Sequence, residues 1–191
     1  SGHVVFDTLH APSAAGAIAR IGSMGVNIQL IADPQIMVGL LSQRLVQTLC
    51  PHCRVPWSEK APTLAGHIRE RLEKYCNEPD VCAPEQLWFR HPDGCEHCQK
   101  KVELTGRIVS RGVTGRTVLA EVIRPDARFM SLLLSHGTSF ARRYWLQHLG
   151  GISRRAHLLR RLAEGLVDPL DGDLVCPLDE DELLACEVPH V

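Results

Sequence analysis

The sequence predicts an α/β segment at its start, a small cysteine-rich insert in its middle and a helical region towards its end. Three observations lead to this fold class. The first residues show strand-like and then helical apolar spacing. Two Cys-x-x-Cys pairs enclose a stretch with several prolines and few regular apolar periods. A second strand-like run then precedes three segments of helical spacing.

The first part of this architecture is expected over residues 1–49. His3–Phe6 is expected to form a short buried strand, and Ser13 is expected to cap a helix that ends at Gly25. Asp33-Pro34 is a second helix-start signal, because an acidic cap is followed by proline in the first turn. The apolar face of that second helix would be Ile36, Met37, Leu40 and Leu41. Residues 44–49 are expected to continue as helix or strand.

Changes in composition and apolar spacing along the chain indicate the remaining segments. Residues 50–98 read as a small insert with one charged helix near residues 67–74 and a core too thin to stand alone. Residues 99–170 contain a strand at Val118–Ile123 and helices expected at 125–137, around 140–149 and at 153–165. Residues 171–191 hold seven acidic residues and no Lys or Arg, and we expect a loosely ordered acidic tail there.

Bulk composition excludes several classes of protein. The chain of 191 residues has a formal charge of −1, with 45% hydrophobic and 23% charged residues, as in an ordinary globular protein. This balance favours neither nucleic acid nor an acidic membrane as partner. No apolar run reaches the roughly 18 residues that span a bilayer. Four of the eight cysteines lie in Cys-x-x-Cys pairs, which favours a metal site and a reducing compartment over disulfides.

The two cysteine pairs are the strongest chemical signal in the sequence. Cys50-Pro-His-Cys53 and Cys95-Glu-His-Cys98 lie 41 residues apart, and Gly94 precedes the second pair. A Cys-x-x-Cys turn presents two thiolates to one ion, so two such turns can complete a tetrahedral Zn(Cys)4 site. Four thiolates leave no open coordination position, so this site would be structural.

Other interpretations of the cysteines remain open at this point. One pair could be a thioredoxin-type redox pair, or the thiols could simply be buried in a core. Cys76 and Cys82 could replace one pair as ligands, although five intervening residues suit a single metal turn poorly. Cys176 and Cys186 read as incidental. His52 and His97 read as solvent-facing turn residues inside the two pairs.

Histidines and arginines provide a second set of candidates. His3 and His10 bracket the first expected strand, where a histidine either has a structural role or reaches a ligand at the carboxyl edge of a sheet. The helical region is rich in arginine. Because exposed aromatic residues do not accompany these arginines, a solvated face or a subunit interface is favoured over nucleic-acid binding. They are Arg142, Arg143, Arg154, Arg155, Arg160 and Arg161.

The order of motifs closely resembles the secretion-motor ATPases of type II secretion and type IV pilus assembly. That family has a histidine box, a helix ending in a Met-Gly-Val sequence, a Gln-Arg-Leu-Val strand leading to Cys-Pro-His-Cys, a tetracysteine domain and a Gly-Arg-Thr-Gly strand with a later Glu. The matching residues here are Gly2-His3, Thr8-Leu9-His10, Arg20, Met24-Gly25-Val26, Gln43-Arg44-Leu45, the four paired cysteines, Gly115-Arg116-Thr117 and Glu121.

The chain also departs from the family pattern. Asp7 replaces the usual Ser, Ala11-Pro12 replaces Thr-Asn, and the stretch between Cys98 and Gly115 is longer than the family's link. These departures indicate a divergent branch, such as a type IVb or plasmid-encoded pilus motor.

The resemblance implies a remnant of a RecA-like core, an inserted tetracysteine zinc subdomain and a C-terminal helical region. It implies that His10 and His3 contact or sense ATP, and that Arg20 and Arg44 serve nucleotide or subunit contacts. The zinc ligands would be Cys50, Cys53, Cys95 and Cys98. ATP and Mg would act in the longer parent, a cytoplasmic homohexamer at the inner membrane that contacts the platform protein of its machine and no nucleic acid.

The P-loop of such a motor is missing from these residues. No GxxxxGK[ST] sequence occurs, and no apolar strand ends in paired acids that could serve as a Walker B motif. Since the chain starts at Ser1-Gly2-His3 without Met, we expect a piece of a longer protein that is inactive alone. The alternative function is a non-enzymatic zinc-binding module for protein or nucleic-acid contact. The sequence does not distinguish secretion from pilus assembly.

Overall fold

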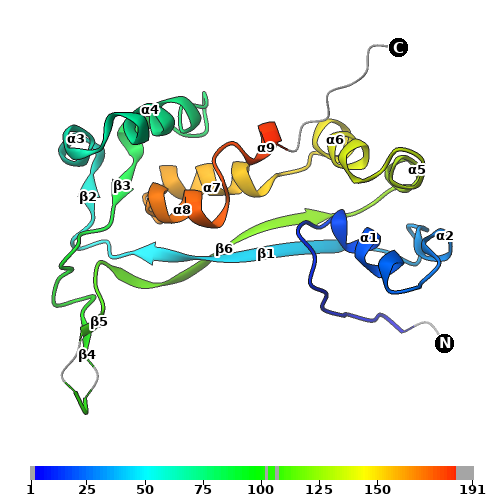
Figure 1. The fold of residues 1–191 in the computed structure, drawn as a ribbon, viewed down its shortest axis with the longest axis horizontal. Coiled ribbons are helices and arrows are strands. Elements are labelled where there is room, and N and C mark those ends of the chain that lie inside the picture. Colours follow the sequence, from blue (N-terminus) through cyan, green and yellow to red (C-terminus); the bar gives the residue numbers. More distant parts are fainter. Residues whose placement is uncertain (1–2, 102, 106–107, 184–191) are drawn as a thin grey trace. The chain divides into compact units, whose positions relative to one another are not determined.

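The computed structural model describes residues 3–101, 103–105 and 108–183 (Figure 1). These residues form two compact units. The first unit contains residues 3–43 and 120–153, and the second contains residues 44–119 and 154–183. We call the second unit the cysteine lobe. Strands β1 (Leu40–Leu49) and β6 (Val113–Ile123) pair in a two-stranded sheet, and each contributes residues to both units.

The first unit combines its parts of β1 and β6 with short and medium helices. These are α1 (Gly16–Ser23), α2 (Ile28–Ile31), α5 (Ala127–His136) and α6 (Thr138–His148). The mixed α/β character predicted from the sequence is therefore confirmed, as are the strand at Val118–Ile123 and the two helices that flank Gly137.

Side-chain caps explain why the first and third of these helices begin where they do. The backbone N–H of Gly16 donates to Ser13 Oγ at 3.1 Å, and the N–H of Phe129 donates to Asp126 Oδ1 at 2.7 Å. Such bonds satisfy donors that have no partner within the helix. Gly25 follows α1 with a φ of +89°, a left-handed conformation that glycine adopts without steric cost. The glycine predicted to follow α1 is thus confirmed, whereas the residue directly before the helix is Ala15 and Ser13 supplies its bond from two residues further back.

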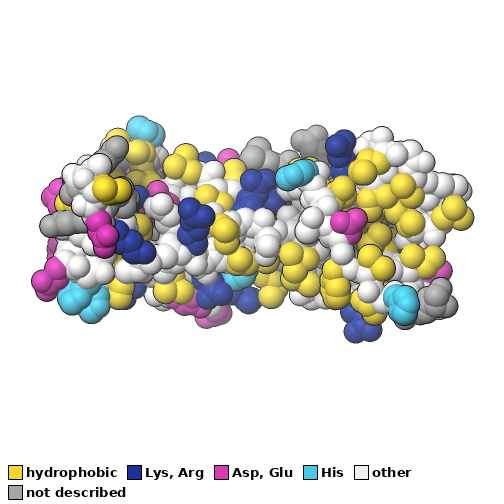
Figure 2. All heavy atoms as spheres, turned by 90° about the horizontal axis from the view of Figure 1, so that it is seen from below, with side chains coloured by type: hydrophobic (Ala, Val, Ile, Leu, Met, Phe, Trp, Pro, Cys, Tyr) yellow, Lys and Arg dark blue, Asp and Glu magenta, His cyan; other side chains and the backbone are white. Residues whose placement is uncertain are grey.

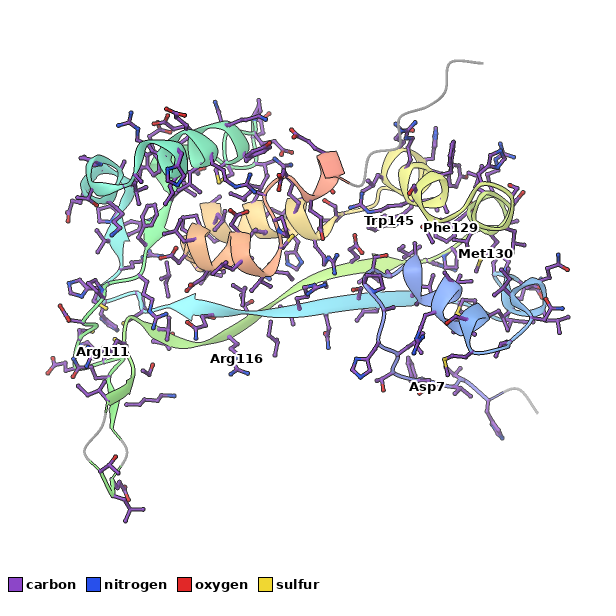
Figure 3. All side chains as sticks on the ribbon, in the orientation of Figure 1. Asp7, Arg111, Arg116, Phe129, Met130 and Trp145 are labelled. Atoms are coloured by element: carbon purple, nitrogen blue, oxygen red, sulfur yellow. The ribbon has the colours of Figure 1, made fainter. Side chains whose placement is uncertain are left out.

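The core of the first unit lies where α1, α5 and α6 meet the two strands. Figure 3 shows Phe129 and Met130 of α5 and Trp145 of α6 on the same side of these helices. All three are almost fully buried, with Ile18 of α1 and Ile123 of β6 in the same cluster. Each such side chain stabilises the fold by about 1.5–3 kcal/mol through burial.

Two predictions for the first unit are wrong. Residues 3–11 form no strand, and Val4, Val5 and Phe6 are 74%, 81% and 94% exposed. The reason is physical, because a strand needs a partner, and no described strand pairs with His3–Phe6.

Figure 2 shows apolar side chains gathered on one face of this unit. Further exposed apolar residues of the unit are Met24, Val26, Leu30, Ile36, Val38, Leu41 and Val122.

The helix expected after Asp33-Pro34 is also absent from the structure. Asp33 Oδ1 accepts a hydrogen bond from Gln35 N at 2.8 Å, but this closes a turn and no helix follows it. Leu40 and Leu41 belong to β1, where alternate side chains point to opposite faces, so Leu40 is buried and Leu41 is exposed. Pairing with β6 overrides the local helix signal.

A buried ion pair crosses the first unit. Glu121 of β6 is 1% exposed and Arg142 of α6 is 7% exposed, and their side chains meet at 3.4 Å between Oε1 and Nη2. The other carboxylate oxygen of Glu121 accepts from the N–H of Ala14 at 3.4 Å. One carboxylate therefore ties together β6, α6 and the start of α1.

The cysteine lobe contains many short elements. They are β2 (Val55–Pro56), α3 (Trp57–Lys60), the 3-10 turns η1 (Ala61–Thr63) and η2 (Pro84–Gln86), α4 (Gly66–Tyr75), β3 (Trp88–Phe89), β4 (Lys100–Lys101), β5 (Ile108–Ser110), α7 (Arg154–Ala163), α8 (Pro169–Val175) and α9 (Glu180–Leu183). β2 pairs with β3 and β4 with β5, both antiparallel. The helices predicted near 67–74 and 153–165 are confirmed.

One hydrophobic core serves the whole lobe. Leu72, Leu87 and Phe89 from the segment between the cysteine pairs pack in one cluster with Leu158 and Leu162 of α7. The lobe therefore extends beyond the boundaries 50–98 that the sequence indicated, because that segment shares its core with the helices that follow residue 153.

The expectation of a loosely ordered tail is wrong for residues 171–183. Helix α8 begins at Pro169, where the cap Asp168 accepts from Leu170 N, and α9 covers Glu180–Leu183. Cys176 and Leu178 between them are completely buried in the core of the lobe. The last residues of the expected tail lie outside the described chain. Among the described helices, none has the length and apolarity needed to cross a membrane.

The Glu121 pair gives a direct test of the first unit. We expect Glu121→Gln to lower the free energy of unfolding by about 3 kcal/mol, because it leaves the buried Arg142 charge without this carboxylate. Urea denaturation followed by circular dichroism measures the change. The matched control Glu70→Gln removes an exposed carboxylate from α4 and should change stability by less than about 0.5 kcal/mol. Equal stabilities of the two variants would contradict the role given to Glu121.

Candidate functional site

The two cysteine pairs occupy tight turns at the edge of the lobe's strands. Cys50 follows β1 directly, and the turn through Cys53 is closed by a hydrogen bond from Arg54 N to Cys50 O at 3.1 Å. The second turn is closed by a bond from Cys98 N to Cys95 O at 3.0 Å. Each turn therefore presents both of its thiols on one side, as the spacing predicted.

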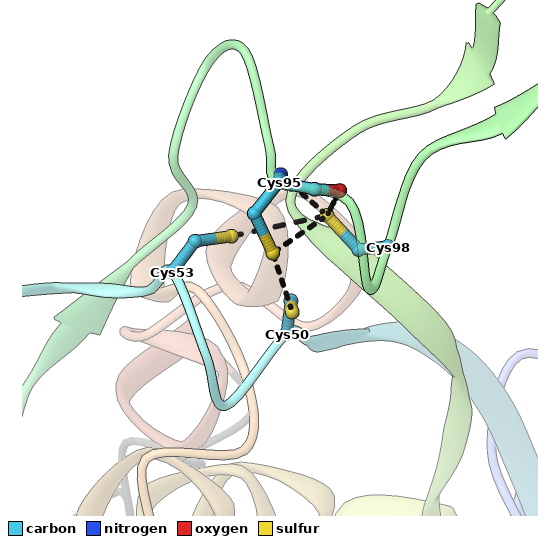
Figure 4. A group of neighbouring side chains, drawn as sticks. All are labelled: Cys50, Cys53, Cys95 and Cys98. Atoms are coloured by element: carbon cyan, nitrogen blue, oxygen red, sulfur yellow. Dashed lines mark hydrogen bonds between the residues drawn. The ribbon is translucent and has the colours of Figure 1, made fainter.

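The four sulfur atoms converge on one point (Figure 4). The sulfur atoms of Cys50 and Cys95 are 3.8 Å apart, those of Cys53 and Cys98 are 3.8 Å apart, and all four lie within 4.8 Å of one another. A tetrahedral ion with metal–sulfur bonds of about 2.3 Å separates its ligand sulfurs by about 3.8 Å. The cluster is thus close enough, and of the right size, to hold one metal ion.

Backbone donors make one of these thiols a good anion. The N–H groups of Cys95 and Gly112 both donate to Cys98 Sγ at 3.1 Å. Burial alone would raise the pKa of Cys98, but these donors and the neighbouring thiols lower it to about 7. Burial and the neighbouring thiols of Cys95, Cys50 and Cys98 raise the pKa of Cys53. Four thiolates this close would repel one another, so a bound cation is what permits all four to ionise.

Gly94 allows the second turn to approach the cluster. Its φ is +67°, and a Cβ atom there would lie 2.7 Å from Gly112 N and 2.8 Å from Cys98 Sγ. Either contact is too short for a carbon atom. The glycine that precedes the second pair is therefore required by both backbone conformation and space.

The other described cysteines do not belong to the cluster. Cys76, at the end of α4, and Cys82 are buried in the core of the lobe, and so is Cys176, whose thiol donates to Glu180 Oε2 at 3.3 Å. Cys186 lies outside the described residues. His52 and His97 are exposed, as expected for turn residues, but their rings also stack with centroids 4.1 Å apart, which the sequence did not indicate.

The predicted nucleotide contacts show no such convergence. His3 and His10 are exposed on residues 3–13, a run without regular structure that we call the histidine segment. Arg20 is exposed on α1, where its side chain donates to Ser23 Oγ at 3.3 Å. Within the described chain, no hydrogen bond or ion pair joins these three residues. Arg44 is exposed on β1, in the cysteine lobe. Gly2 lies outside the described residues.

The histidine segment is nevertheless anchored at its end. Ser13 caps α1, and the N–H of Ala14 bonds the buried Glu121 carboxylate. The sequence did not identify Glu121 and Arg142 as a pair. A signal for it was present, because an acidic residue inside the apolar run Val118–Ile123 needs a cationic partner once it is buried.

Most arginines of the helical region make ion pairs inside their own unit. Arg142 meets Glu121, Arg154 meets Glu180 at 2.6 Å, and Arg155 meets Glu78 at 2.9 Å. The expected solvated face is wrong for Arg142 and Arg154, which are 7% and 3% exposed. These contacts leave little free positive charge on α7. By contrast, Arg116 of β6 is exposed and points away from α7 and α8 in Figure 3.

A substitution at Gly94 tests the geometry of the cluster. We expect Gly94→Ala to destabilise the lobe by about 1–3 kcal/mol and to weaken metal retention, because alanine resists a positive φ and its Cβ collides with the sulfur of Cys98. Denaturation midpoints and metal content after gel filtration measure both effects. Gly66→Ala is the control, since nothing lies within 4 Å of a Cβ atom at this helical position. A Gly94→Ala chain that kept its metal and its midpoint would contradict the packing described.

Comparison with known proteins agrees with the order of motifs in the chain. Residues 1–157 match the family described as "Type II/IV secretion system protein". The chain is 46% identical over 130 residues to a putative type II secretion system protein E of Escherichia coli K12, covering 67% of this chain and 22% of that protein.

Two further relatives carry ATPase in their names. The type II secretion system ATPase E of Vibrio cholerae is 31% identical over 135 residues, 71% of this chain and 22% of the relative. The type IV pilus assembly ATPase TfpB of Acinetobacter baylyi is 30% identical over 135 residues, 71% of this chain and 19% of the relative. The chain thus spans about a fifth of the length of these relatives. Because the family match covers most of the chain, this protein belongs to the type II/IV secretion system protein family.

Proposed function

We propose that this chain is the C-terminal part of a hexameric ATPase that powers pilus assembly or type II protein secretion. The observation that carries the proposal is the family match over residues 1–157, together with the names of relatives of which it spans about a fifth. In this proposal the P-loop and the Walker B acids belong to another part of the same protein, and the first unit is the last part of its RecA-like core.

The exposed apolar face of the first unit supports this assignment. Val4, Val5 and Phe6 form an exposed apolar run that pairs with no described strand. Leu41 of β1 and Val122 of β6 also expose apolar side chains. Two strands alone are marginally stable in water, and apolar residues on both faces are typical of a strand inside a larger sheet. Additional strands and helices of a RecA-like core would cover these residues.

The histidine segment then supplies contacts to nucleotide. His10 and His3 are exposed, and no hydrogen bond or ion pair with another described residue holds their imidazoles away from a ligand. An imidazole can donate a hydrogen bond to a phosphate oxygen as negative charge develops on it during hydrolysis. Arg20 and Arg44 would contact nucleotide or a neighbouring subunit, because a guanidinium binds phosphate and carboxylate in a bidentate manner. ATP and Mg would be bound mainly by the P-loop of the longer protein.

The cysteine cluster would hold one structural zinc ion. Cys50, Cys53, Cys95 and Cys98 supply four sulfur ligands at the spacing of a tetrahedral site, and their number leaves no position for a substrate. Bound zinc would supply the positive charge that lets four adjacent thiols ionise. The lobe would then present a rigid surface at the cytoplasmic side of the inner membrane, where the platform protein of the machine is the expected partner.

The ATPase assignment predicts a specific kinetic effect. In the protein that contains this chain together with a P-loop, we expect His10→Ala to lower the rate of Mg-dependent ATP hydrolysis about a hundredfold through loss of one hydrogen-bond donor to phosphate. His67→Ala, an exposed histidine on α4, should leave the rate unchanged. The chain alone should show no turnover. Magnesium-dependent hydrolysis by the chain alone would contradict this division of the site.

The zinc assignment predicts the metal content of the purified chain. Inductively coupled plasma mass spectrometry should find about one zinc per chain, and Cys50→Ser or Cys98→Ser should remove it, because three ligands hold zinc far more weakly than four. Cys82→Ala should keep the ion, since Cys82 lies outside the cluster. A chain with intact, reduced thiols that bound no metal would contradict the assignment. A zinc-loaded chain whose longer parent lacked ATPase activity would favour a non-enzymatic zinc module.

A further inference from the structure

Residues 158–183 lie beyond the family match, yet they are built into the cysteine lobe. They comprise most of α7, all of α8 and α9, and the turns between them. Leu158, Leu162 and Leu178 in this segment are completely buried against Leu72 and Leu87 from the segment between the cysteine pairs. The segment therefore completes the hydrophobic core of the lobe that carries the two cysteine pairs.

Two of its acidic residues are paired with one arginine of α4. Arg71 donates to both carboxylate oxygens of Asp173 at 2.9 and 3.0 Å and to both of Asp179 at 2.8 and 3.4 Å. This double bidentate contact holds the pKa of Asp179 below its usual value. Leu178 N also donates to Asp173 Oδ1 at 2.8 Å. The contact thus fixes the turn that places Leu178 in the core.

A second arginine also connects the end of α4 with the turn between α8 and α9. Arg155 of α7 donates to Tyr75 O at 3.0 Å, to Glu78 Oε2 at 2.9 Å and to Leu178 O at 2.6 Å. The hydroxyl of Tyr75 donates to Glu182 Oε2 at 3.0 Å. Several polar contacts between residues far apart in the sequence therefore link the end of α4 to the turn at Leu178 and to α9.

The segment also bonds the two residues that flank the first cysteine pair and one residue that lies five positions before the second pair. Leu49 N, next to Cys50, donates to Leu166 O at 2.8 Å, and Arg54 Nη1, next to Cys53, donates to Gly165 O at 2.5 Å. On the path to the second pair, Arg90 N donates to Asp168 Oδ2 at 2.7 Å. Both chain runs that carry the sulfur ligands thus rest on one continuous segment.

We infer that residues 158–183 act as a strap that holds the two cysteine pairs at ligand spacing, so that retention of the metal ion depends on the Arg71 contact. This inference rests on the proposed metal site. Arg71, Asp173 and Asp179 are 34%, 26% and 25% exposed. At that exposure salt screens the contact, so raised ionic strength loosens the strap.

The test is the rate of zinc release from the loaded chain to excess chelator, followed with a metallochromic dye. We expect Arg71→Gln to release zinc about tenfold faster than the native chain, and Asp179→Asn to shift the rate in the same direction by a smaller factor. Arg69→Gln is the matched control, because Arg69 pairs on the same helix only with the exposed Glu73. Added sodium chloride should accelerate release from the native chain and have little effect on Arg71→Gln.

The outcomes separate the strap from the metal assignment. Native, Arg71→Gln and Arg69→Gln chains with the same release rate would overturn the strap while leaving the zinc site intact. If the native chain holds no zinc, hydrogen exchange replaces the release assay. Arg71→Gln must then speed exchange at the amides of Leu49 and Arg90, whose acceptors Leu166 O and Asp168 Oδ2 belong to the strap, and unchanged exchange would overturn the inference. Circular dichroism establishes that each variant is folded, and Asp179→Asn provides the milder change if Arg71→Gln is not.

Discussion

The cysteine lobe depends on placing four sulfur atoms around one point. Thiols that lie 3.8 Å apart cannot all ionise without a cation, and their backbone donors would be poorly used if they remained neutral. Several groups near the cluster help to bring the four sulfur atoms together. Gly94 lets one turn approach, Gly112 donates to a sulfur, and both chain runs are held by hydrogen bonds from outside the turns. The lobe is organised around a site for an ion and has no position in that site for a substrate.

The hydrophobic core of the lobe explains why a metal site alone would not stabilise the lobe. The segment between the cysteine pairs does not close its own core, because Leu72, Leu87 and Phe89 are covered by α7 and α8, which come much later in the chain. Three acidic residues that read as part of a tail, Asp173, Asp179 and Glu180, are the counter-charges of Arg71 and Arg154. The core and the ion pairs therefore stabilise the same small lobe, and the proposed metal ion would add to them, as expected for a unit whose burial alone is limited.

The sequence predicted what depends on local chemistry. Ser13 and Gly25 bound α1, the spacing of α5 to α7 is helical, and the two Cys-x-x-Cys turns lie where their ligand geometry requires. The sequence did not predict the features that depend on partners far away along the chain. His3–Phe6 has the composition of a strand and no described partner, and Leu40–Leu41 fit a helix until β6 pairs with them. The bonds of Asp173 and Asp179 join α4 across a hundred residues, and no local pattern in a single sequence identifies that pairing.

Family membership places the chain among the type II/IV secretion system proteins. We propose that its nucleotide contacts lie on the histidine segment and that the cysteine lobe has a structural role. The central claim is that one zinc ion, bound by four thiolates, holds that lobe together. Zinc-edge X-ray absorption spectroscopy of the purified chain tests it most directly. The account predicts a single shell of four sulfur ligands at about 2.3 Å. A shell that contained nitrogen or oxygen ligands, for example from His52 or His97, would contradict it.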